Sequence, residues 1–142
     1  MEIIRNKEIE NGTAQFGRVY LCGDLQYSDG VDAIKTTGYE IGITDYPEYT
    51  FEKAHLHSFN KEFNYVLEGR IKVLLLKEKK EFIFEKGDLF VIGTNEPSVA
   101  KIEAGSKTIF SKVPGGNDKV LIAMEEPVLR WGKAWDNAYM EE

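Results

Sequence analysis

The chain has 142 residues, of which 42% are apolar and 30% charged, a composition that excludes an intrinsically disordered protein. A formal net charge of −6 disfavours binding to nucleic-acid phosphates, so we expect no nucleic-acid partner. The lone cysteine, Cys22, excludes an internal disulfide, residues 1–15 lack the apolar stretch of a secretion signal, and the longest apolar run (73–76) is too short to span a membrane. We therefore expect a cytoplasmic protein without a membrane partner.

Short segments rich in β-branched and aromatic residues follow one another along the chain, separated by glycine or polar turns. Nine of them predict strands, at residues 17–22, 39–44, 64–67, 71–76, 81–85, 89–93, 98–103, 107–113 and 119–124. Short strands at this spacing favour a β-sandwich or β-barrel over alternating strand–helix units. The tail departs from the pattern. Pro127 and the tryptophans at 131 and 135 predict a short helix that packs on the body of the protein.

Both histidines of the chain stand together, at His55 and His57, and Glu62 follows five residues later. Alternate residues of a strand point to the same face, so the two imidazoles share a face, and Glu62 can return to it across the next turn. Two imidazoles and a carboxylate form the facial triad that holds Fe(II), and Mn, Ni or Zn accept the same ligands. The competing interpretation is a pair of incidental histidines on an exposed strand.

This segment resembles the first motif of the cupin superfamily, which reads His-x-His, three or four residues, Glu, six residues, Gly. Here His55 and His57 are followed after four residues by Glu62 and after six more by Gly69. The second cupin motif begins Gly-Asp, which resembles Gly87 and the aspartate after it. The resemblance covers residues 55 to about 102.

The chain departs from the cupin pattern at several positions. Tyr49 stands in place of the opening glycine of the first motif, and Gly93 and Asn95 replace the proline and glycine of the second. Ser98 occupies the position of the third metal-binding histidine, and Ile102 that of the terminal asparagine. The resemblance therefore implies three protein ligands for a divalent metal, with water at the fourth position. The alternative is a pocket that binds a small molecule without metal.

The resemblance implies an all-β fold, a double-stranded β-helix whose two antiparallel sheets close into a jelly-roll barrel. We expect one domain over residues 1–142, with the barrel at about 38–124 and a helical or irregular C-terminal tail. Counting by two from Glu62 directs Asn64 into the pocket. Ser98 would border the open side of the metal. Arg70, at the rim, would pair with a carboxylate or phosphate of a ligand.

These expectations leave more than one function open. The first is a metal-dependent cupin that acts on a small polar metabolite as an isomerase, lyase or dioxygenase. The second is a non-catalytic cupin that serves as a sensor or accessory protein. The third is a metal-free, sugar-modifying cupin, whose general base would be His55, His57 or a glutamate. Small cupins commonly pair, so the resemblance also implies a homodimer.

Overall fold

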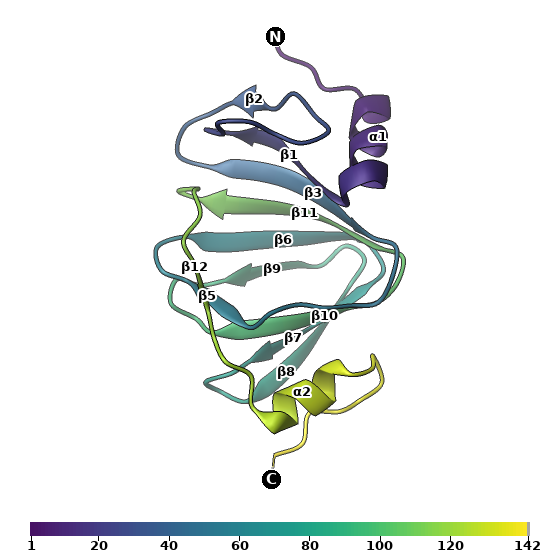
Figure 1. The fold of residues 1–142 in the computed structure, drawn as a ribbon, viewed down its shortest axis with the longest axis vertical. Helices are drawn as coiled ribbons and strands as arrows, with labels where there is room; N and C mark the ends of the chain where they lie inside the picture. Colours follow the sequence, from purple (N-terminus) through teal and green to yellow (C-terminus); the bar gives the residue numbers. More distant parts are fainter. Residues whose placement is uncertain (142) are drawn as a thin grey trace.

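The computed structural model describes residues 1–141, in which two helices and twelve strands are present (Figure 1). In chain order they are α1 (Asn6–Phe16), β1 (Arg18–Gly23), β2 (Ile34–Lys35), β3 (Glu40–Tyr46), β4 (Thr50–Phe51), β5 (His55–His57), β6 (Lys61–Glu68), β7 (Arg70–Leu75), β8 (Lys80–Glu85), β9 (Leu89–Ile92), β10 (Ser98–Ile102), β11 (Ser106–Val113), β12 (Lys119–Leu121) and α2 (Glu126–Gly132). Among these residues, neither helix has the length and apolar character needed to cross a membrane.

The strands form two six-stranded sheets (Figure 1). The first sheet has the order β2-β1-β3-β11-β6-β9, and the second has β12-β5-β10-β7-β8 with β4 paired to β10. All pairs are antiparallel except β1 with β2. No hydrogen-bonded ladder joins the two sheets within residues 1–141, so the expected closure into a barrel is corrected to two facing open sheets. The chain crosses between the sheets in loops, which cannot supply a continuous ladder.

All nine predicted strands are present, and so is the predicted helix after the strand region, which begins at Glu126. Helix α1 was not expected, because the weak helix formers Asn, Gly and Thr interrupt the middle of its sequence NKEIENGTAQF. Packing stabilises it instead: Gly12 is buried, and a Cβ added there would lie 2.9 Å from Val19 Cγ1 on β1. Glycine therefore lets the helix backbone approach the first sheet.

Both faces of the second sheet carry clusters of buried apolar side chains. Its inner face contributes Ile71, Val73 and Ile102 to a cluster that lies against the first sheet. Its outer face packs against α2, where Trp131 is fully buried. The buried Lys101 Nζ donates to three carbonyl oxygens at and after the end of α2, those of residues 131, 134 and 137. Lysine at a helix C-terminus satisfies carbonyls that the helix itself leaves unpaired.

Candidate metal centre

A cavity of about 1090 Å³ is lined by side chains from both sheets. The three predicted ligands line it, and so do Asn64 on β6 and Ser98 on β10. Ser98 pairs in register with His55 on the neighbouring strand. Arg70 is not among the lining residues. Its Nη2 instead lies 2.5 Å from Glu103 Oε2 and its Nε 3.2 Å from Oε1, so its fork binds a carboxylate of the protein itself.

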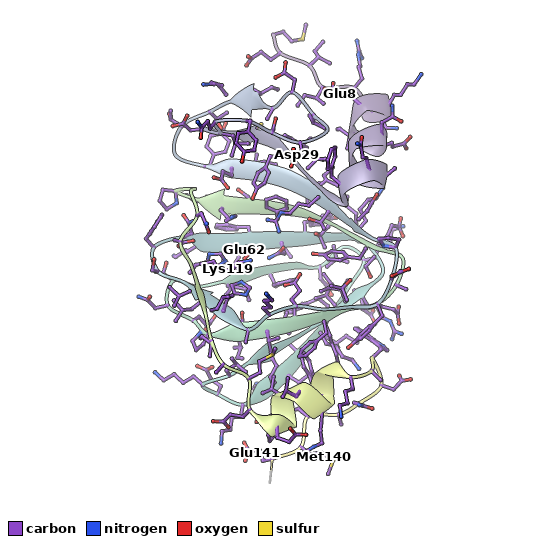
Figure 2. All side chains as sticks on the ribbon, viewed as in Figure 1. Glu8, Asp29, Glu62, Lys119, Met140 and Glu141 are labelled. Carbon is purple, nitrogen blue, oxygen red and sulfur yellow. The ribbon has the colours of Figure 1, made fainter. Side chains whose placement is uncertain are left out.

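His55, His57 and Glu62 come together, but from opposite sides of the cavity. The histidines lie on β5 in the second sheet, whereas Glu62 lies on β6 in the first, from which it extends into the space between the sheets (Figure 2). One ligand atom from each residue lies within 4.8 Å of the others. The turn after His57 therefore carries the chain from one sheet to the other, rather than returning it to the same face as the spacing suggested.

The two imidazoles are held by their Nδ1 atoms. His55 Nδ1 lies 2.8 Å from the carbonyl oxygen of Lys53, to which it donates, so His55 Nε2 is left as the ligand atom. His57 Nδ1 donates to Asp118 Oδ1 at 2.7 Å, which leaves His57 Nε2 facing Glu62 Oε2 at 2.8 Å. Histidines that bind metals are commonly oriented in this way, by a carbonyl or carboxylate on the other ring nitrogen.

Hydrogen bonds and charges within the centre shift the pKa values of its ionisable side chains. The hydrogen bond to Glu62 raises the pKa of His57, with Asp118 adding to the effect against the opposing influence of burial. Burial alone would raise the pKa of the Glu62 carboxyl, but the hydrogen bond and charge of His57 lower it to about 2. Burial lowers the pKa of His55, which favours its neutral, ligand-competent form. Glu62 is therefore a carboxylate at neutral pH.

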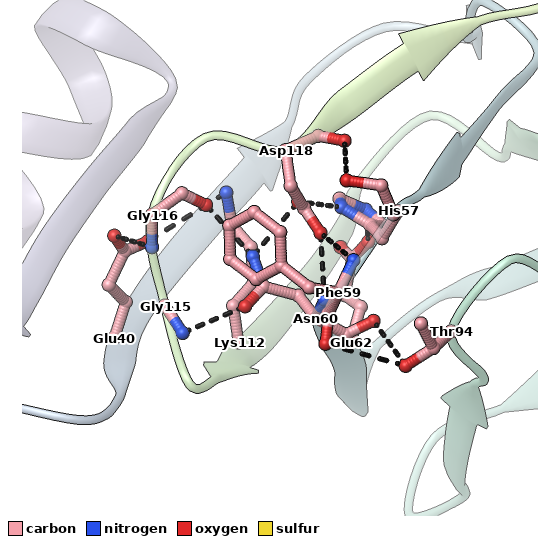
Figure 3. Close-up of polar contacts among 11 residues, drawn as sticks. Glu40, His57, Phe59, Asn60, Glu62, Thr94, Lys112, Gly115, Gly116 and Asp118 are labelled. Atoms are coloured by element: carbon pink, nitrogen blue, oxygen red, sulfur yellow. Dashed lines mark hydrogen bonds and ion pairs between the residues drawn. The ribbon is translucent and has the colours of Figure 1, made fainter.

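Asp118 is the residue of the candidate centre that the sequence did not reveal. Besides His57, it accepts hydrogen bonds from the backbone N–H groups of Phe59 and Asn60, at 2.9 and 2.7 Å, and from Asn60 Nδ2 at 2.9 Å (Figure 3). Its side chain is fully buried. Residues 114–118 read PGGND, a sequence that predicts a loop and no chemistry. No local pattern connects this aspartate with a histidine that lies 61 positions earlier.

A second acidic group lines the same cavity. The Tyr46 hydroxyl donates to Glu52 Oε1 at 3.3 Å. Burial raises the pKa of the Glu52 carboxyl, and the negative charge of Glu62 raises it further. Burial also raises the pKa of Tyr46. Both groups therefore hold their protons more strongly in the folded protein than in the unfolded chain.

We expect the Glu52→Gln variant to be more stable than the parent protein at pH 8 but not at pH 4. A carboxyl whose pKa is raised by folding favours the folded state only below its unfolded pKa, and this contribution is lost as the pH rises through the folded pKa. Glutamine stays neutral and can still accept from Tyr46. Urea unfolding of both proteins at pH 4 and pH 8 checks the difference, and equal stabilities at pH 8 would contradict it.

Solved structures with the same fold support this architecture. KdgF from Halomonas sp. matches with 23% identity and a TM-score of 0.52, over 58% of this chain and 74% of its own. A double-stranded β-helix protein from Klebsiella pneumoniae matches with 12% identity and a TM-score of 0.54, over 63% of this chain and 78% of its own.

A third similar structure is the nucleoside dehydratase Pac13, which matches with 12% identity and a TM-score of 0.53, over 61% of this chain and 70% of its own. A variant of this protein from Streptomyces was solved with uridine. No family model and no curated protein matches the sequence. The structural likeness confirms the double-stranded β-helix fold that the resemblance to cupins implied.

Proposed function

We propose that this protein binds a divalent metal ion through His55, His57 and Glu62 and acts on a small polar metabolite in the cavity beside it. The observation that carries the proposal is the convergence of three ligand atoms within 4.8 Å of one another, from two separate sheets. Independent contacts hold the rings: the Lys53 carbonyl orients His55, and Asp118 orients His57.

The donor set fits Fe, Mn, Ni or Zn, because two imidazoles and one carboxylate leave coordination positions open for water or a ligand. When bound, the ion would polarise a carbonyl group or lower the pKa of a bound water. Glu62 enters the site already ionised, and Asp118 keeps the His57 proton on Nδ1 once Nε2 is used for the metal. Ser98 and Asn64 offer hydroxyl and amide groups to the ligand. Isomerase, lyase and dioxygenase reactions all suit such a site.

A second candidate is a metal-free cavity that binds its ligand by hydrogen bonds alone. The observation that favours it is the direct contact of His57 Nε2 with Glu62 Oε2, which satisfies both groups without an ion. A variant of Pac13, whose fold is similar, was solved with uridine, which supports a small polar molecule as the ligand of this candidate. The two candidates differ in whether the protein carries metal.

The deciding experiment is a metal assay on protein purified without added metal or chelator. We expect close to one Fe, Mn, Ni or Zn ion per chain, and a higher melting temperature when the ion is added back to metal-stripped protein, since binding to the folded state stabilises it. The Glu62→Gln variant should lose both the metal and the stabilisation, because a neutral amide is a far weaker ligand than a carboxylate.

Glu52→Gln is the matched control, since it makes the same change in the same cavity outside the ligand group. It should keep its metal, and so should Ser98→Ala. A wild-type protein that carries no metal and gains no stability from any of the four ions would overturn the proposal in favour of the metal-free candidate.

A further inference from the structure

Arg18, the first residue of β1, lines the cavity without an anionic partner. Its guanidinium lies over the Phe110 ring, with Cζ 3.6 Å from the ring centroid, and 5.6 Å from the centroid of Tyr20. Within residues 1–141, no carboxylate lies within ion-pair distance of it, and its buried Nε makes no hydrogen bond. The side chain is partly buried, and the carboxylates of Glu52 and Glu62 influence it only from beyond ion-pair distance, so its planar fork is left open to a bound anion.

A second cation of the cavity, the buried Lys112, already has a carboxylate partner. Lys112 Nζ lies 3.7 Å from Glu40 Oε2, and both side chains are largely buried. Glu40 also accepts from the backbone N–H of Gly116 at 2.8 Å, which fixes it in place. The protein thus supplies a carboxylate within ion-pair distance of Lys112 but none within that distance of Arg18, whose positive charge acts on Glu52 and Glu62 only from farther away.

Thr44 provides a second unsatisfied group at the same place. It is the register partner of Arg18 across β1 and β3, so the two side chains stand next to each other on the cavity face of the first sheet. Thr44 is only 7% exposed, and its buried Oγ1 has no hydrogen-bond partner. Buried hydroxyls in native proteins are nearly always hydrogen-bonded, so this one points to a ligand.

The neighbouring strand holds the guanidinium in place. Phe110 is buried on β11, and its ring lies across Gly42 of β3, where an added Cβ would stand 2.2 Å from Phe110 Cζ. Tyr20 meets the same ring edge-on at 5.3 Å. Stacking on this fixed ring restricts the arginine, which reduces the entropy that a bound anion would otherwise have to overcome.

We propose that Arg18 and Thr44 bind a carboxylate group of the small ligand. The planar guanidinium fork matches two carboxylate oxygens, and the threonine hydroxyl donates to one of them. A carboxylate group, which carries one negative charge, suits this place better than a phosphate group, which carries up to two, because Glu40 and Glu62 already bring negative charge to the same cavity. The inference rests on the proposed function in one respect, namely that one cavity holds both the metal centre and the carboxylate site. It narrows the ligand to a small carboxylic acid with a second polar group that faces the metal centre.

Malonate serves as the probe and uncharged malonamide as its isosteric control. We expect malonate, but not malonamide, to bind and to raise the melting temperature of both metal-stripped and metal-loaded protein. Arg18→Met keeps the apolar stem and removes the charge, and it should weaken malonate binding about 10–100-fold in calorimetric titration. Thr44→Val should weaken it by a smaller factor. Both variants should keep the metal content of the parent.

Arg18→Lys is a second variant for the case that Arg18→Met does not fold. It keeps the positive charge but lacks the planar guanidinium, so it should also bind malonate more weakly than the parent protein. Equal malonate binding by parent and arginine variants, or equal binding of malonate and malonamide, would overturn the inference. Tighter binding of inorganic phosphate than of malonate would overturn the choice of carboxylate. Because malonate is tested without metal as well, failure of the metal proposal and failure of this one give different results.

Discussion

Replacing Asp118 with alanine is expected to lower the free energy of unfolding by about 3–5 kcal/mol and to weaken metal binding about 10–100-fold. The buried carboxylate accepts hydrogen bonds from His57, from two backbone N–H groups and from the Asn60 amide, so its removal leaves several buried donors without a partner. It also releases the ring of His57, which then has no group to keep its proton on Nδ1.

The stability loss should depend on pH. The hydrogen bonds from His57 and from the backbone outweigh burial and lower the pKa of the Asp118 carboxyl below its unfolded value. Its contribution is therefore fully present above the unfolded pKa, near pH 4, and is lost as the pH falls toward the folded pKa. Urea unfolding at pH 7 and at pH 3 should show a large difference between parent and variant at pH 7 and a smaller one at pH 3.

Asp45→Ala is the matched control for this experiment. Asp45 Oδ1 forms a partly exposed ion pair with Lys107 at 3.4 Å, and such pairs contribute no more than about 1 kcal/mol. This variant should keep nearly all of its stability and its full metal affinity. If Asp118→Ala were equally mild in both measurements, Asp118 would be neither the anchor of residues 57–60 nor the group that orients His57.

Replacing Gly42 with alanine is expected to destabilise the protein by at least about 2 kcal/mol and to weaken malonate binding while metal binding persists. The new Cβ would lie 2.2 Å from Phe110 Cζ and 2.6 Å from the carbonyl oxygen of Val19, closer than real Cβ atoms come. The Phe110 ring would have to move, and the Arg18 guanidinium rests on that ring. Gly42 pairs in register with Tyr20 and Phe110, and the candidate ligands 55, 57 and 62 pair with other residues, so the metal centre should remain.

Gly93→Ala gives the comparison, because the nearest atom to a Cβ at Gly93 is Glu96 Oε1, at an ordinary 3.9 Å, and its backbone does not need glycine. It should change stability by no more than about 0.5 kcal/mol. Thermal unfolding followed by malonate titration tests both variants. A Gly42→Ala protein that unfolds at the parent temperature and binds malonate normally would show that the ring does not support Arg18.

The strands and the candidate metal ligands could be predicted from the sequence because both depend on residues that are close together in the chain. Segments rich in β-branched and aromatic residues between glycine or polar turns favour strands, and all nine strands predicted in this way are present. The spacing of His55, His57 and Glu62, which resembles the first cupin motif, pointed to three side chains that do lie together and could hold a metal. Helix α1 escaped prediction because its stability comes from burial of Gly12 against β1 rather than from helix propensity.

By itself, the sequence determined where most strands run, which three side chains converge and that a short helix follows the last strand. The tertiary structure alone decided that Glu62 approaches the histidines from the opposite sheet, that Asp118 orients His57, and that Arg18 rather than Arg70 faces the cavity unpaired. The physical reason is the order of strands in the sheets. Register between β1 and β3, or a hydrogen bond spanning 61 residues, depends on which strands become neighbours, and local side-chain patterns carry no information about that.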